Sequence, residues 1–154
     1  MSDPKEVQIL KEITERCATI NRRDGFYTDI GNNVKRGPIN LSACDFPIMS
    51  VLSGTPAGAE RVADRQRNSF SVTIEAHREI ENHDAPEDEG WEMANDIYRA
   101  VEKRLDMSKP NALVVKRIEF VSCAVGYPEG EGAIVSAIVE YSINYSRGYG
   151  NNQT

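Results

Sequence analysis

Residues 69–77 read SFSVTIEAH and carry the clearest structural signal in the chain. Phe70, Val72, Ile74 and Ala76 are spaced two residues apart, with a polar residue before and after each. Because successive side chains of a β-strand point to opposite faces, this alternation predicts a strand with one buried face and one polar face. Half-buried strands of this kind are typical of antiparallel sheets.

Further strands are predicted on both sides of this one. Two long alternating stretches, 112–125 and 133–146, are joined by a loop rich in glycine, which fits a hairpin connection. The apolar stretch 46–52 predicts another strand, which Pro47 restricts to a sheet edge or a strand start. Residues 26–37 suggest a short additional strand.

Two amphipathic helices are predicted, at residues 4–22 and at about 86–106, because their apolar residues recur every three or four positions. Asp3 is the predicted N-cap of the first helix, and Gly25 is its stop signal. The first stripe contains Val7, Leu10, Ile13, Cys17 and Ile20, and the second contains Trp91, Ala94, Tyr98, Val101 and Leu105.

This order of elements predicts an α+β fold, with a mainly antiparallel sheet of about five strands and two amphipathic helices packed on one face. We expect a single domain over residues 1–147 and a flexible polar tail over residues 148–154. The uncovered sheet face would carry Ile134 and Ile138 and, depending on register, Ile118 and Phe120. So much apolar surface predicts a partner, and self-association is the simplest choice.

The charge of the 154-residue chain is unevenly distributed. The net charge is -6, yet residues 79–96 hold eight acidic residues and no Lys or Arg, so the remaining residues sum to +2. This distribution excludes a general basic surface for nucleic acid. Glu87, Asp88 and Glu89 stand in the first turn of the second predicted helix, where carboxylates complement the helix dipole. We therefore expect an exposed acidic patch whose charge can be reversed with little effect on folding.

Candidate chemistry is sparse. His77, His83 and Asp84 offer a metal-dependent hydrolase as an alternative, but their spacing matches no metal motif, and both histidines are expected at the surface. Glu92 and Asp96 share a helix face, which more often means a solvated surface than paired acid/base catalysis.

Cys17, Cys44 and Cys123 form no C-x-x-C pair and are predicted to be reduced core residues. We expect no enzyme, cofactor, signal peptide or membrane span.

Two groups of residues are candidates for contacts with partners. Arg61, Arg65 and Arg67 lie in a predicted loop, residues 54–68, and are assigned to partner docking, with a solvated loop as the alternative. Tyr141, Tyr145 and Tyr149 repeat every four residues near the C-terminus and, with Arg147, are assigned to subunit contacts. Core packing is the alternative role for Tyr141 and Tyr145.

Several phrases of the sequence resemble a known family. They are GFYTDIG at 25–31, FPIMSV at 46–51, FSVTIEA at 70–76, DIYRAV at 96–101, and the final strand ending at Tyr145. In their order and spacing, over residues 6 to 150, they resemble tail terminator proteins of long-tailed bacteriophages. Other phage neck and head-completion proteins share the same general fold and remain alternatives.

The resemblance implies a structural virion protein without a cofactor. Such a protein would form a hexameric ring that caps the tail tube, ends its polymerisation and presents its other face to the capsid connector. Its partners would be further copies of itself, the tail tube protein and a connector or neck protein. DNA would pass through the ring without sequence-specific binding. The ring would be assembled in the host cytoplasm and lie at the capsid-proximal end of the tail, with the loop 54–68 facing the tube. An adaptor for host proteins is a further alternative.

Overall fold

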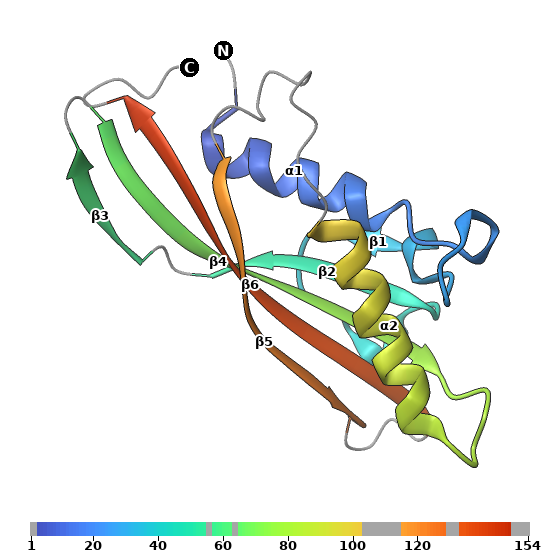
Figure 1. The fold of residues 1–154 in the computed structure, drawn as a ribbon. Coiled ribbons are helices and arrows are strands. Elements are labelled where there is room, and N and C mark those ends of the chain that lie inside the picture. Colours follow the sequence, from blue (N-terminus) through green and yellow to red (C-terminus); the bar gives the residue numbers. More distant parts are fainter. Residues whose placement is uncertain (1–2, 55–56, 63–64, 103–114, 129–132, 149–154) are drawn as a thin grey trace.

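The computed structural model describes residues 3–54, 57–62, 65–102, 115–128 and 133–148 of the chain. It confirms the predicted α+β class (Figure 1). The two α-helices are α1 (Lys5–Cys17) and α2 (Pro86–Val101), and short 3-10 turns occupy Arg22–Asp24, Ile30–Asn32 and Leu41–Ala43. The strands are β1 (Val34–Lys35), β2 (Ile48–Ser53), β3 (Ala57–Val62), β4 (Arg65–Glu79), β5 (Val115–Gly126) and β6 (Ile134–Gly148).

The sheet is built around β4 and β6, which pair antiparallel along their whole length, from Arg65↔Gly148 to Glu79↔Ile134. The order is β1-β2-β4-β6-β5, and among the described strands only β1 and β2 pair in parallel. β2 and β3 lie one after the other along the same edge of β4. The predicted loop over residues 54–68 is therefore wrong for its described residues from Ala57 onward, which form β3 and the start of β4.

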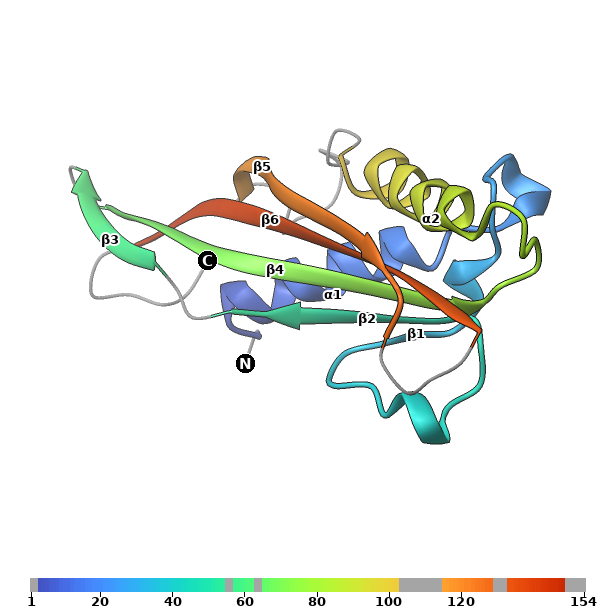
Figure 2. The same cartoon turned by 90° about the horizontal axis from the view of Figure 1, so that it is seen from below.

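Both helices pack on the same face of the sheet, as predicted (Figure 2). The Tyr145 hydroxyl donates to the Glu6 carboxylate of α1, and the Tyr141 hydroxyl donates to Glu102, just after α2, at 2.7 Å. Register places the two tyrosines on the face of β4 that carries Val72. The alternating apolar residues of this face are buried. Burial of apolar surface is the largest favourable contribution to the free energy of folding.

The helix boundaries and buried stripes differ from the prediction. Helix α1 ends at Cys17, five residues early, and Asp3 pairs with Lys11 at 2.5 Å without capping the helix. In α2 the buried residues are Glu89, Gly90, Met93, Ala94, Asp96, Ile97, Ala100 and Val101. Trp91 is 42% exposed, because the stripe that faces the sheet is centred on Met93 and Ile97. Neither described helix is long and apolar enough to cross a bilayer.

The uncovered face of the sheet is mostly polar. Ile118 and Phe120 pair with Ile143 and Tyr141, which puts them on the helix-covered face. Of the two isoleucines expected on the open face, Ile134 is 6% exposed and Ile138 is 37% exposed. The predicted excess of apolar groups on this face is therefore wrong.

Candidate functional site

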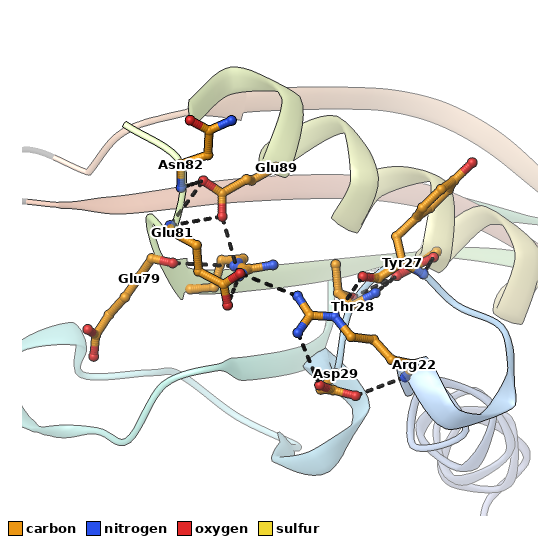
Figure 3. Close-up of polar contacts among 10 residues, drawn as sticks. Arg22, Tyr27, Thr28, Asp29, Glu79, Glu81, Asn82 and Glu89 are labelled. Carbon is orange, nitrogen blue, oxygen red and sulfur yellow. Dashed lines mark hydrogen bonds and ion pairs between the residues drawn. The ribbon is translucent and has the colours of Figure 1, made fainter. Parts of the chain in front are cut away.

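The acidic segment after β4 contains a buried carboxylate at the start of α2. Glu89 accepts hydrogen bonds from the backbone N–H groups of Glu81, at 3.0 and 3.1 Å, and Asn82, at 3.0 Å (Figure 3). It also pairs with Arg78 at 3.3 Å, and both side chains are 8% exposed. Of the predicted acidic patch, Glu87 and Asp88 are exposed, but Glu89 is a structural residue that fixes the turn before α2.

Asp96 is the second buried carboxylate of this segment. Its side chain is fully buried and accepts hydrogen bonds from the backbone N–H groups of Tyr27, at 3.0 Å, and Thr28, at 2.8 Å. The Thr28 hydroxyl donates to it as well, at 2.7 Å. The expectation that Asp96 lies on a solvated helix face is therefore wrong, because Asp96 is buried and holds the loop that follows α1 against α2.

An ion-pair chain crosses the end of the sheet next to these residues. Arg22 approaches Asp29 at 3.7 Å and Glu81 at 3.6 Å (Figure 3). Glu81 in turn pairs with Arg78 at 2.5 Å. A cavity of about 350 Å³ opens here, and both arginines line it together with Glu79, Phe46 and other residues. We call this cavity the acidic-end pocket.

His77 is buried, although it was expected at the surface. Its Nδ1 atom contacts the Ser136 hydroxyl, and its Nε2 atom lies 3.3 Å from a Glu75 oxygen. Burial lowers the pKa of His77 below 6.5, and Glu75 opposes this shift. The order serine, histidine, carboxylate is that of a hydrolytic triad. However, His77 and Ser136 are only 4% and 5% exposed and do not line the acidic-end pocket, so they act as a structural network.

The residues of the hydrolase alternative are not brought together. His77 is buried, whereas His83 and Asp84 are exposed. In the described part of the chain, no group of three or more His, Cys, Asp and Glu side chains is placed to hold a metal ion.

The three cysteines are free thiols. Cys17 is fully buried, as predicted, and burial raises the pKa of its thiol to about 12, so it is not a thiolate at neutral pH. Cys44 and Cys123 are only partly buried, which corrects the prediction that all three lie in the core.

The structure places Arg147 on a strand next to Arg61, Arg65 and Arg67, although Arg147 lies far from them in the sequence. Arg61 of β3 is in register with Gln66 of β4, which is in register with Arg147 of β6. Arg65 and Arg67 lie on β4 in the same three strands. We call the segments 57–62, 65–69 and 144–148 the arm. Figures 1 and 2 show these segments side by side, at the end of the sheet beyond the helices.

Two of the tyrosines assigned to subunit contacts are core residues. Tyr141 and Tyr145 are 0% and 2% exposed, so their side chains pack in the core and do not reach the surface where a second copy would bind. Burial and the Glu102 carboxylate raise the pKa of Tyr141, so its hydroxyl stays protonated. Tyr149 lies outside the described residues, as does the predicted tail except for Gly148, the last residue of β6.

The similarity of this chain to known proteins lies in its fold. No protein-family model and no curated protein matches the sequence. Among solved structures, the chain is similar to one described as "Virion of native gene transfer agent (GTA) particle". The TM-score is 0.60 and the identity is 8%, covering 90% of this chain and 94% of that one. The two chains share a fold.

Proposed function

We propose that this chain is a structural protein of a phage-like virion. The observation that carries the proposal is the fold shared with a chain of a gene transfer agent virion over 90% of this chain. We further propose, from the resemblance to tail terminator proteins, a ring of six copies that caps the tail tube and ends its polymerisation. Its opposite face would meet the capsid connector or a neck protein, and DNA would pass through without sequence-specific binding.

The geometry supports assembly better than chemistry. In the described part of the chain, β5 pairs only with β6, so one edge of the sheet is open to another protein. Phe120 and Val121 are each 50% exposed on this strand. Unpaired edge groups and exposed apolar side chains are typical of surfaces that bind a second chain. The buried carboxylates Glu89 and Asp96 are occupied by structural hydrogen bonds, which leaves neither for acid/base work.

Electron microscopy of the purified chain with and without purified tail tubes tests the proposal. We expect rings with sixfold symmetry and, in the mixture, a density at one end of each tube. Gold labelling of the chain in intact particles should mark the capsid-proximal end of the tail. A monomer that leaves the tube ends bare would contradict the proposal, and a label on another neck component would favour a head-completion role.

A further inference from the structure

The outer edge of β5 is open in the described part of the chain. β5 pairs antiparallel with β6 from Val115↔Tyr145 to Gly126↔Ser136, and it pairs with no other described strand. In an edge strand, every second residue directs its backbone N–H and C=O groups away from the sheet. A second extended chain is the partner that satisfies such a row of groups.

This edge carries little of the protection that sheet edges usually have. Proteins block their edges with lysine, proline or bulges. The last register shift along β5 lies between Phe120 and Ser122, which marks a bulge, and from Ser122 to Gly126 the register runs without interruption. The stretch 120–126 reads FVSCAVG and contains no charged residue and no proline. The part of β5 from Ser122 to Gly126 can therefore pair with another strand.

Exposed apolar side chains accompany the open edge. Phe120 and Val121 of β5 are each 50% exposed, and Trp91 of α2 is 42% exposed. α2 lies beside β5 here, since the Val125 side chain packs against Gly90, the residue before Trp91. Apolar surface next to unpaired backbone groups is typical of a protein-binding surface. A strand added to β5 would cover part of it.

The same sheet has a second open edge on its opposite side. Among the described strands, β3 pairs only with β4, on the side of β4 away from β6. Figure 1 shows β3 and β5 at opposite margins of the sheet. β3 has six residues and no proline or lysine, whereas β1, also at this margin, has two residues. β3 is therefore better able than β1 to pair with another chain.

We propose that the outer edge of β5 of one copy pairs with the outer edge of β3 of a second copy, so that the sheet continues from copy to copy. The two edges lie on opposite sides of one sheet, so each needs a partner from outside the chain. Their pairing joins unlike surfaces, repeats from copy to copy, and closes into a ring when the rotation between neighbours allows it. Pairing of β5 with β5 would stop at two copies and leave β3 open. The inference rests on the proposed function and deepens it by naming the strands that join the ring.

Disulfide cross-linking of the full chain tests the contact. Cys44→Ser and Cys123→Ser remove the two partly buried thiols, and the remaining cysteine is fully buried. In this background, Ser122→Cys or Ala124→Cys, both exposed on β5, is combined in turn with a cysteine at each position of β3. After oxidation we expect covalent multimers beyond the dimer, strongest at one β3 position and weak at its sequence neighbours. Directly opposite residues of paired strands lie within disulfide reach, whereas adjacent side chains point to the other face.

Two controls separate this contact from others. Tyr27 is 58% exposed and lies outside both edges, so Tyr27→Cys combined with the same β3 cysteines should give no multimers. Ser122→Cys or Ala124→Cys alone should run as a monomer on a denaturing gel, because the proposed pairing does not bring β5 against β5. Dimers from either variant alone would overturn the proposal in favour of pairing between two β5 strands.

Sedimentation velocity of Val121→Lys provides a second measurement. A lysine at the edge hinders strand pairing and should weaken self-association on the order of tenfold. Val121 is half-exposed and has no partner on β6 in the strand register, so the variant should remain folded, which thermal unfolding checks. Tyr27→Lys is the matched control, because it also replaces an exposed aromatic or aliphatic side chain by lysine, and it should associate as the wild type does.

The proposal is overturned if the wild-type chain stays monomeric, if no β3 position gives cross-links, or if Val121→Lys associates as tightly as the wild type. Rings joined by these cross-links that never bind tail tubes would refute the tail role alone. Capped tubes in which the cross-links never form would refute the strand contact and leave the tail role standing.

Discussion

The carboxylate of Asp96 accepts two hydrogen bonds from Thr28, one from its backbone N–H at 2.8 Å and one from its hydroxyl at 2.7 Å. Both residues are fully buried. The contact fastens the loop after α1 to the middle of α2, although the two residues are 68 positions apart. A buried carboxylate is tolerated here because donors surround it.

Asp96→Ala should lower the free energy of unfolding by about 3 kcal/mol or more, because it leaves the Tyr27 and Thr28 donors buried without an acceptor. Chemical denaturation measures the loss. Glu92→Ala on the same helix is the control, since Glu92 has no partner among the described residues, and it should change stability by less than about 0.5 kcal/mol. Equal effects for the two variants would contradict the structural role of Asp96.

Reversing the charge of Glu89 should have a very different effect from reversing that of Asp88. Glu89→Lys removes the acceptor for two backbone N–H groups and places a cation beside the buried Arg78, which predicts a loss of about 3 to 5 kcal/mol. Asp88→Lys changes only an exposed charge near the helix N-terminus and should cost less than about 1 kcal/mol. Thermal unfolding of the two variants compares them directly, and a stable Glu89→Lys protein would refute the assignment.

The stability of the protein should fall as the pH drops below neutral, in part because of His77. Burial depresses its pKa, so between the folded pKa and 6.5 the unfolded chain binds more protons than the folded chain. The free energy of unfolding therefore decreases as the pH is lowered through that interval. His77→Asn keeps a polar group near Ser136 but does not titrate, so denaturation at about pH 7.5 and about pH 5.5 should show a smaller difference than in the wild type. An unchanged difference would exclude His77 as its source.

Gly31 should tolerate no side chain. A Cβ atom at this position would lie 2.5 Å from the backbone oxygen of Ile20 and 2.6 Å from that of Cys17. Because these atoms belong to the backbone, Gly31→Ala should cost about 1 to 3 kcal/mol or more. Gly126→Ala is the control, since nothing lies within 4 Å of its Cβ position. Melting temperatures distinguish the two, and equal values would contradict the close packing.

Tyr141→Phe tests whether this tyrosine serves the core or a subunit contact. The variant loses the hydrogen bond to Glu102 and keeps the buried ring, so we expect a loss of about 1 kcal/mol in stability. Self-association measured by sedimentation should remain as in the wild type. A variant with normal stability and impaired association would restore the role in subunit contacts.

The strand at Phe70 to Ala76 and the helix covering of one sheet face were predictable from the sequence, because residue periodicity reports local geometry directly. The stripe of α2 was harder to predict. Trp91 fits the helical spacing as well as Met93 does, so spacing alone does not show which side of the helix faces the sheet. Packing against β5 and β6 decides it, since Val125 and Val135 lie close to Gly90 of the helix.

The roles of Glu89, Asp96 and His77 could not be read from the sequence. An acidic residue at a helix start has the same local pattern whether it is solvated or buried, and the difference depends on partners far away in the chain. The alignment of Arg147 with Arg61, across Gln66 on the strand between them, likewise depends on the register of three strands.

By itself, the sequence determined the class of fold, the central strand and the uneven charge, because composition and period are local properties. The tertiary structure alone decided which acidic residues are buried, which tyrosines belong to the core and which arginines share the arm. Those outcomes depend on strand pairing over long separations. A buried charge is stable only where the fold supplies its donors, as Thr28 does for Asp96.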